Sequence, residues 1–310
     1  IAIAAGVASG LLQGALALPA AGGLLFAYIA PLPLFLAGLG LGVRGAVIAV
    51  LVAGGLSMMF GGPGFAATQA VFYGLPVIVI SRQALLSRTD GRGQVHWYPP
   101  GRILLWLAGM AVAGLVFGLA GLSLFGDGLM AYLNAVMAPF AEQFSDAEQR
   151  EVLVALVDYL PAFFAVSWIL GLIFNGVLAQ GLLVRFGYNI APSPELADIR
   201  LPMAWIGTLL AALLLASMTG LLGVFGKTLA AIAIVPYFVL GLGVVHGFFR
   251  PWKGRLAMLI LFYGLLFLWP LPILVAGLGL LNAVLRLARG DNLSNTGGAG
   301  DSGGSADKEE

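Results

Sequence analysis

Seven uncharged polar residues stand inside long apolar stretches of the sequence: Gln13, Gln69, Tyr73, Asn175, Gln180, Tyr237 and Tyr263. Five of them, in the stretches 65–81, 161–185 and 228–249, are our candidate ligand-binding residues. They are Gln69, Tyr73, Asn175, Gln180 and Tyr237. An amide or phenol group that stays unpaired in hydrocarbon costs several kcal/mol, so each side chain needs another helix or a polar cavity beside it. Together these groups are suited to bind a small, neutral or nearly neutral ligand through hydrogen bonds and aromatic contacts. The plain alternative is that they hydrogen-bond neighbouring helices and only hold the fold together.

Proline and glycine interrupt the apolar stretches beside several of these residues. Gln69 and Tyr73 lie one helical turn apart, just before Gly74 and Pro76, and Tyr237 directly follows Pro236. Broken helices near the middle of a membrane free backbone groups, which transporters use to bind substrates. We therefore predict a ligand site among the stretches 65–81, 161–185 and 228–249.

The residues needed for catalysis or metal binding do not come together in the sequence. Every acidic residue lies in a loop, at the edge of an apolar stretch or in the C-terminal tail, so no buried carboxylate relay is available. Val7 stands where a rhomboid-like Gly-x-Ser-Gly motif around Ser9 would need glycine. The chain has no Cys and two His, too few ligands for a zinc site. We predict no catalytic residue, no metal, no cofactor and no enzymatic activity.

The composition is that of an integral membrane protein. Apolar residues make up 60% of the chain and charged residues 9%, against ~45–50% and ~25% in soluble domains. We predict an all-α, polytopic transmembrane bundle of about nine or ten spans, several of them broken by proline. The bilayer is its expected partner, a membrane protein could be a second, and no nucleic acid is expected. The predicted spans cover residues 1–20, 22–42, 46–60, 65–81, 103–124, 161–185, 203–221 and 228–249, and two short spans fill 256–285.

Basic residues give the predicted orientation, because they remain in the cytoplasm. Acidic residues dominate before the stretch 161–185, whereas Arg185 and Arg200 follow its apolar part. The loop 82–102 carries four Arg against Asp90 alone, which marks a second cytoplasmic end. Both termini are then cytoplasmic, Lys227 lies in an outside turn, and the amphipathic segment 127–158 lies on the outer surface.

Two further features concern packing and domains. Gly6, Gly10 and Gly14 recur every four residues and form one stripe, which predicts close packing against a neighbouring helix of the same chain. Residues 1–289 form the membrane domain. Residues 290–310 are rich in Gly, Ser, Asp and Asn, which predicts a disordered cytoplasmic tail.

Several segments in combination resemble one family of membrane proteins. They are APLPLFLAGLGLG, HWYPPGRILLW, FGDGLMAYLNAVMAPF, PELADIRLPMAWI and VPYFVLGLGVVHG. They are similar to the YybS-like family of predicted bacterial inner-membrane proteins, which carries the domain of unknown function 2232. The resemblance covers nearly the whole chain except the tail. It implies a location in the bacterial plasma membrane and a remote similarity to the substrate-binding subunits of energy-coupling-factor transporters and to MreD.

Two classes of function follow from these observations. The first is a small-molecule binding or transport protein, which the broken spans and the uncharged polar residues favour. The second is a non-catalytic envelope scaffold like MreD, which the glycine stripe, the amphipathic segment and the lack of charged pore residues favour. A closed polar cavity would support the first class, and a solid core with an exposed apolar groove would support the second.

Overall fold

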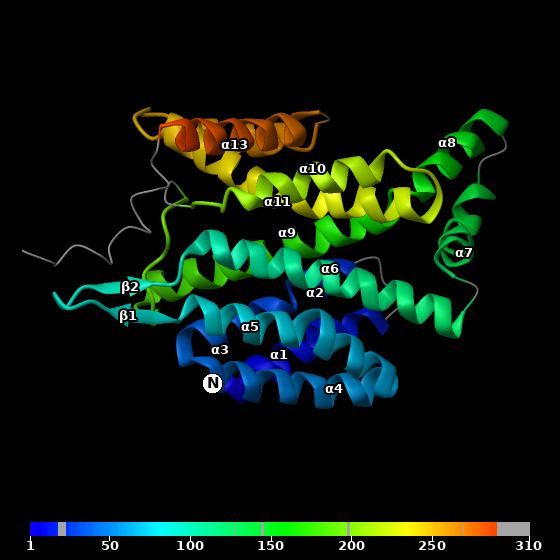
Figure 1. Ribbon diagram of the computed structural model, residues 1–310. Helices are drawn as coiled ribbons and strands as arrows, with labels where there is room; N and C mark the ends of the chain where they lie inside the picture. The colour runs from blue at the N-terminus through cyan, green and yellow to red at the C-terminus, as the bar shows by residue number, and fades with distance from the viewer. Residues whose placement is uncertain (18–22, 127, 144–145, 197–198, 269, 290–310) are drawn as a thin grey trace, which may run out of the picture. The chain divides into compact units, whose positions relative to one another are not determined.

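The computed structural model describes residues 1–17, 23–126, 128–143, 146–196, 199–268 and 270–289. Helices contain 81% of these residues, which confirms the predicted all-α membrane bundle (Figure 1). The chain divides into two compact units, Ile1–Pro236 and Tyr237–Glu310. The predicted tail 290–310 lies outside the described residues.

The first unit begins with seven short or interrupted elements. They are α1 (Ala2–Gly14), the 3₁₀ turn η1 (Ala15–Ala17), α2 (Gly23–Ile29), α3 (Pro31–Leu41), α4 (Val43–Gln69), the π-helix η2 (Ala70–Gly74) and α5 (Leu75–Ala84). Pro31 opens α3, so the predicted span 22–42 is broken at Ala30. Prolines favour such breaks because they lack the N–H that continues a helix.

A strand pair and longer helices complete this unit. They are β1 (Ser87–Thr89), β2 (Val95–Trp97), α6 (Pro100–Phe125), α7 (Leu129–Ala141), α8 (Ala147–Val157), α9 (Leu160–Phe186), α10 (Ala204–Ala216) and the first half of α11 (Gly220–Phe249). The antiparallel pair β1–β2 was not predicted, because strands of three residues are too short to show an alternating pattern. Helices α7 and α8 occupy the segment that we predicted to be amphipathic.

The chain reverses its direction inside α4. Gly62 has a positive φ of 73° and precedes Pro63, which interrupts the helical backbone. After this point the chain returns to Gly54: a Cβ atom built on Gly54 would lie 3.6 Å from the Gln69 Oε1 atom. In a straight helix the two residues would be ~22 Å apart. Figure 1 shows the returning segment as α5. The single run Val43–Ala84 therefore contains the two predicted spans 46–60 and 65–81.

The number of spans differs from our prediction. Six helical runs among the described residues are long and apolar enough to cross a membrane. One of them, Val43–Ala84, counts once but contains two of the predicted spans. The predicted spans 1–20 and 203–221 correspond to α1 and α10, of 13 residues each. A crossing needs ~20 residues, and α10 is shorter than that. Lys227 also lies inside α11, not in a turn as predicted.

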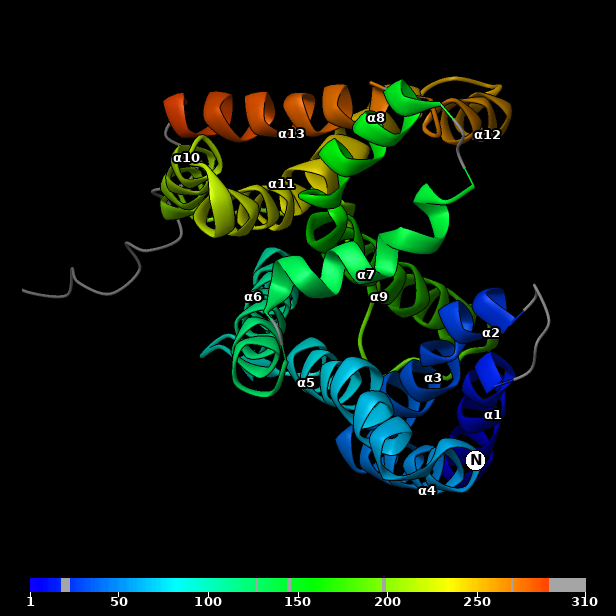
Figure 2. The same cartoon turned by 90° about the vertical axis from the view of Figure 1, so that its right-hand side faces the viewer.

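The predicted glycine stripe packs on α4. A Cβ at Gly6 would overlap the carbonyl oxygen of Ala49, and one at Gly10 would lie 2.9 Å from Cβ of Leu56. Helices α1, α3 and α4 lie side by side (Figure 2). The partner of the stripe is therefore an internal helix, as predicted.

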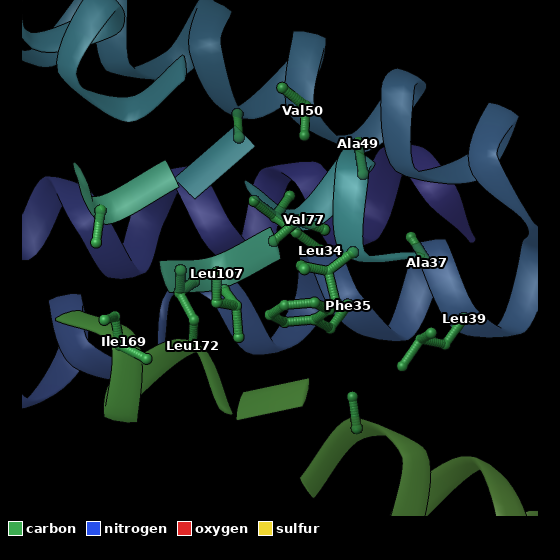
Figure 3. Close-up of a cluster of buried hydrophobic side chains, with 14 of the residues drawn as sticks. Leu34, Phe35, Ala37, Leu39, Ala49, Val50, Val77, Leu107, Ile169 and Leu172 are labelled. Carbon is green, nitrogen blue, oxygen red and sulfur yellow. The ribbon is translucent and has the colours of Figure 1, made fainter. Parts of the chain in front are cut away.

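The core of the first unit brings helices together that are far apart in sequence. Phe35 of α3, Val77 of α5, Leu107 of α6 and Leu172 of α9 are all buried in one cluster (Figure 3). The cluster is apolar, and half-buried Tyr73 and Trp168 pack against its edge.

The second unit contains the second half of α11, α12 (Arg255–Leu265) and α13 (Leu271–Ala288). Its two longer segments approach closely through glycines. A Cβ at Gly241 would overlap the carbonyl oxygen of Val275, and one at Gly279 would overlap that of Tyr237. Of the predicted pair of spans in 256–285, α13 alone is long enough to cross a membrane.

Candidate functional site

A π-helix interrupts the returning segment directly before Pro76. Pro76 has no N–H to bond the carbonyl of Phe72 four residues earlier. The Nε1–H group of Trp168 on α9 donates to this carbonyl at 2.8 Å, and the two aromatic rings meet edge to face at 6.4 Å. The interruption is therefore held by α9, and such π-turns are frequent at functional sites.

Gln69 is the last residue of α4 and directly precedes this π-helix. Its side chain is fully buried, and neither Oε1 nor Nε2 has a hydrogen-bond partner in the described part of the chain. Gly54 lies beside this amide and has no side chain. A Cβ atom placed on Gly54 would be in ordinary contact with Oε1, at 3.6 Å. Buried polar side chains in proteins usually have hydrogen-bond partners, so this amide is an unusual polar group in an apolar region.

Asn175 on α9 is also fully buried and only partly paired. Its Nδ2 atom donates to the carbonyls of Tyr28 at 2.9 Å and of Gly171 at 2.7 Å. Among the described residues its Oδ1 atom has no partner. The bond to Tyr28 connects α9 to the end of α2, where the chain breaks before Pro31.

Two aromatic residues that sequence reasoning missed complete this region. The Tyr28 hydroxyl donates to the Ser167 carbonyl at 2.8 Å. Trp168 bonds the π-helix as described above. Both residues stand inside predicted spans, and their polar atoms need acceptors there, which was the available signal.

The other two predicted site residues lie elsewhere. Gln180 donates from Nε2 to the carbonyl of Ala191 at 2.8 Å, so it attaches α9 to the following loop, as the packing alternative expects. Tyr237 belongs to the second unit, where its side chain is fully buried and its hydroxyl has no partner in the described chain.

Two pockets open in the first unit, and none of the five predicted residues lines either one. A pocket of about 270 Å³ lies between α6, α10 and α11 and is lined by apolar side chains and Thr208. A larger pocket of about 600 Å³ follows α6 from Tyr98 and Arg102 to Ala113.

Charged groups are paired in the β1–β2 hairpin and between Lys227 of α11 and Asp158. In the β1–β2 hairpin, His96 and the backbone N–H groups of Gln94 and Arg92 bond to the Asp90 carboxylate. These bonds lower the pKa of Asp90 from its ordinary value, with His96 as the largest cause. Lys227 of α11 pairs with Asp158 at 2.7 Å. No cluster of three His, Cys, Asp or Glu side chains occurs in the described ranges.

The comparisons with known proteins give a family. A family model described as "Predicted membrane protein (DUF2232)" matches residues 10–282. No curated protein and no solved structure matches the chain. The remote similarity to energy-coupling-factor subunits and to MreD stays an expectation.

Proposed function

The chain belongs to this family of predicted membrane proteins, and we propose that it binds a small, uncharged ligand beside the π-helix. The site would contain Gln69, Tyr73 and Asn175, with Tyr28 and Trp168 holding the surrounding backbone. We further propose that the protein resides in the bacterial inner membrane with both termini in the cytoplasm, and that it is not an enzyme.

The buried, unpaired amide of Gln69 is the observation that carries this proposal. Gln13 on α1 provides an internal comparison, because it is equally buried and receives a hydrogen bond from Ser57 at 3.3 Å. The fold thus provides a protein partner for one buried glutamine and none of its described residues for the other. An amide offers one acceptor and two donors, so it suits a neutral ligand with both kinds of group.

The region also has the right supports for a site. Trp168 and Asn175, both on α9, hold the backbone at Phe72 and Tyr28. These bonds fix α9 to the two interrupted segments that contain Tyr28 and Phe72. No charged side chain takes part in these bonds, which favours an uncharged ligand.

Replacement of the two glutamines by leucine tests the proposal. Native mass spectrometry of the full chain in mild detergent records any small molecule that copurifies, and thermal unfolding records stability. Gln69→Leu should abolish the bound mass while the ligand-free protein keeps or gains stability, because an unpaired amide leaves the core. Gln13→Leu should keep the bound mass and lose about 1 kcal/mol with its bond to Ser57.

Two outcomes would contradict a ligand site. One is that the Gln69→Leu protein loses stability as Gln13→Leu does and retains any copurifying mass. The other is that the unmodified protein carries no mass and Gln69→Leu behaves as a simple packing mutant. Either result would favour the scaffold class, in which the polar residues serve only packing.

A further inference from the structure

The larger pocket is a groove along one face of α6. Its lining residues on this helix recur at intervals of three and one, which places them on a single face. They are Arg102, Leu105, Trp106, Gly109, Met110 and Ala113. Tyr98 closes the groove at the hairpin end, and Pro202 lies beside it. The backbone of Arg200 packs directly on Gly101, so the loop before α10 forms one wall.

The mouth of the groove is basic and aromatic. Arg102 is exposed, and no acidic side chain pairs with it among the residues that the structure describes. The one carboxylate of the loop 82–102, Asp90, is already bonded to His96 and to the hairpin turn. Trp106 donates to the Tyr98 hydroxyl at 3.1 Å, which leaves that hydroxyl free to donate outward. Tyr and Trp prefer the headgroup depth of a membrane.

The body of the groove is apolar and has the length of one leaflet. From Arg102 to Ala113 the helix rises ~16 Å, which is about half of a ~30 Å hydrocarbon core. Gly109 forms the open floor, since nothing lies within 4 Å of a Cβ placed there. The volume of about 600 Å³ is within the usual range of ligand pockets.

We propose that this groove binds an anionic glycerophospholipid of the surrounding bilayer. The phosphate pairs with Arg102 and accepts a hydrogen bond from Tyr98, and an acyl chain lies along Gly109 and Ala113. The charge supports this occupant, because the loop 82–102 carries four Arg against one Asp. A juxtamembrane cluster of this kind attracts anionic headgroups. This site is separate from the proposed neutral-ligand site and does not depend on it.

Charge variants test the headgroup. The full chain in mild detergent is titrated with phosphatidylglycerol, and native mass spectrometry counts the bound lipid. Arg102→Gln should weaken retention about fivefold. Arg92→Gln, at the hairpin turn outside the groove, changes the net charge equally and should weaken retention clearly less than Arg102→Gln, because it removes only the diffuse attraction of the loop. Equal losses in both variants would overturn the site in favour of diffuse attraction.

Shape variants and other probes test the occupant. Gly109→Leu fills the groove and should reduce retention, whereas Gly118→Leu adds the same side chain at another open position of α6 and should not. Phosphatidylcholine should bind more weakly than phosphatidylglycerol. Equal retention of phosphatidylcholine, equal losses in both leucine variants, or equally tight binding of glycerol 3-phosphate alone would each overturn the proposal.

Discussion

At the scale of single residues, the pairing of Trp168 with the Phe72 carbonyl is the contact that compensates for Pro76. A proline in a span leaves a carbonyl without its helical donor, and in lipid no water replaces that donor. The indole N–H provides the bond from another helix. The π-helix η2 therefore depends on a hydrogen bond from α9 as well as on the local sequence around Pro76.

Trp168→Phe should destabilise the protein for this reason. Phenylalanine keeps an aromatic ring and removes the N–H, so the Phe72 carbonyl loses this hydrogen bond at a cost of about 0.5–1.5 kcal/mol. Thermal unfolding in detergent measures the loss. Pro76→Ala returns a backbone N–H to the helix, so Trp168→Phe should cost clearly less in that background. The same cost in both backgrounds would show that the indole matters only through its volume.

Sequence reasoning found part of the candidate site and missed part of it. Gln69 and Asn175 could be identified because an amide inside an apolar stretch is rare and needs a partner. Tyr28 and Trp168 were missed because aromatic residues are common in spans, and their role depends on which carbonyls lie opposite. That information belongs to tertiary structure. The paired state of Gln180 could not be predicted for the same reason, since its acceptor is on a loop.

At the scale of elements, small residues determine which helices touch. The four-residue spacing of Gly6, Gly10 and Gly14 predicted a packing face, and α4 is the helix that covers it. Lipid gives no hydrophobic drive between helices, so close backbone contact has to come from such positions. The lengths of α1 and α10 were harder to predict, because apolar composition continues through turns in this chain. The strands β1 and β2 were missed because three residues are too few to show an alternating pattern.

Gly6→Ala should weaken the contact between α1 and α4. The new methyl group would overlap the Ala49 carbonyl, and backbone cannot move aside as a flexible side chain can. Overpacking of this kind costs about 1–3 kcal/mol. Gly55→Ala, on α4 with open space around it, is the matched control and should be neutral or slightly stabilising. Thermal unfolding of the two variants measures this difference in stability. Equal melting temperatures would contradict close packing at Gly6.

At the scale of the whole molecule, ion pairs and loops bear on the orientation in the membrane. Asp158 and Lys227 form a salt bridge, so the start of α9 and the beginning of α11 lie at the same end of the first unit. The Lys227 ammonium also lies 4.8 Å from the centre of the Tyr159 ring. We predicted both ends to be outside, and the basic hairpin between α5 and α6 to be inside. The pairing is consistent with one common outer end.

Single cysteines can test this orientation, because the protein has no cysteine of its own. Gln143 follows α7 and Thr89 ends β1, and both are exposed. In intact cells Gln143→Cys should react with a membrane-impermeant thiol reagent, whereas Thr89→Cys should react only after the cells are opened. The expectation rests on the Arg excess of the loop 82–102, since basic loops are retained in the cytoplasm. A permeant reagent should label both variants and serves as the control for accessibility. Labelling of Thr89→Cys but not Gln143→Cys in intact cells would reverse the orientation, and would move the proposed lipid groove to the outer leaflet.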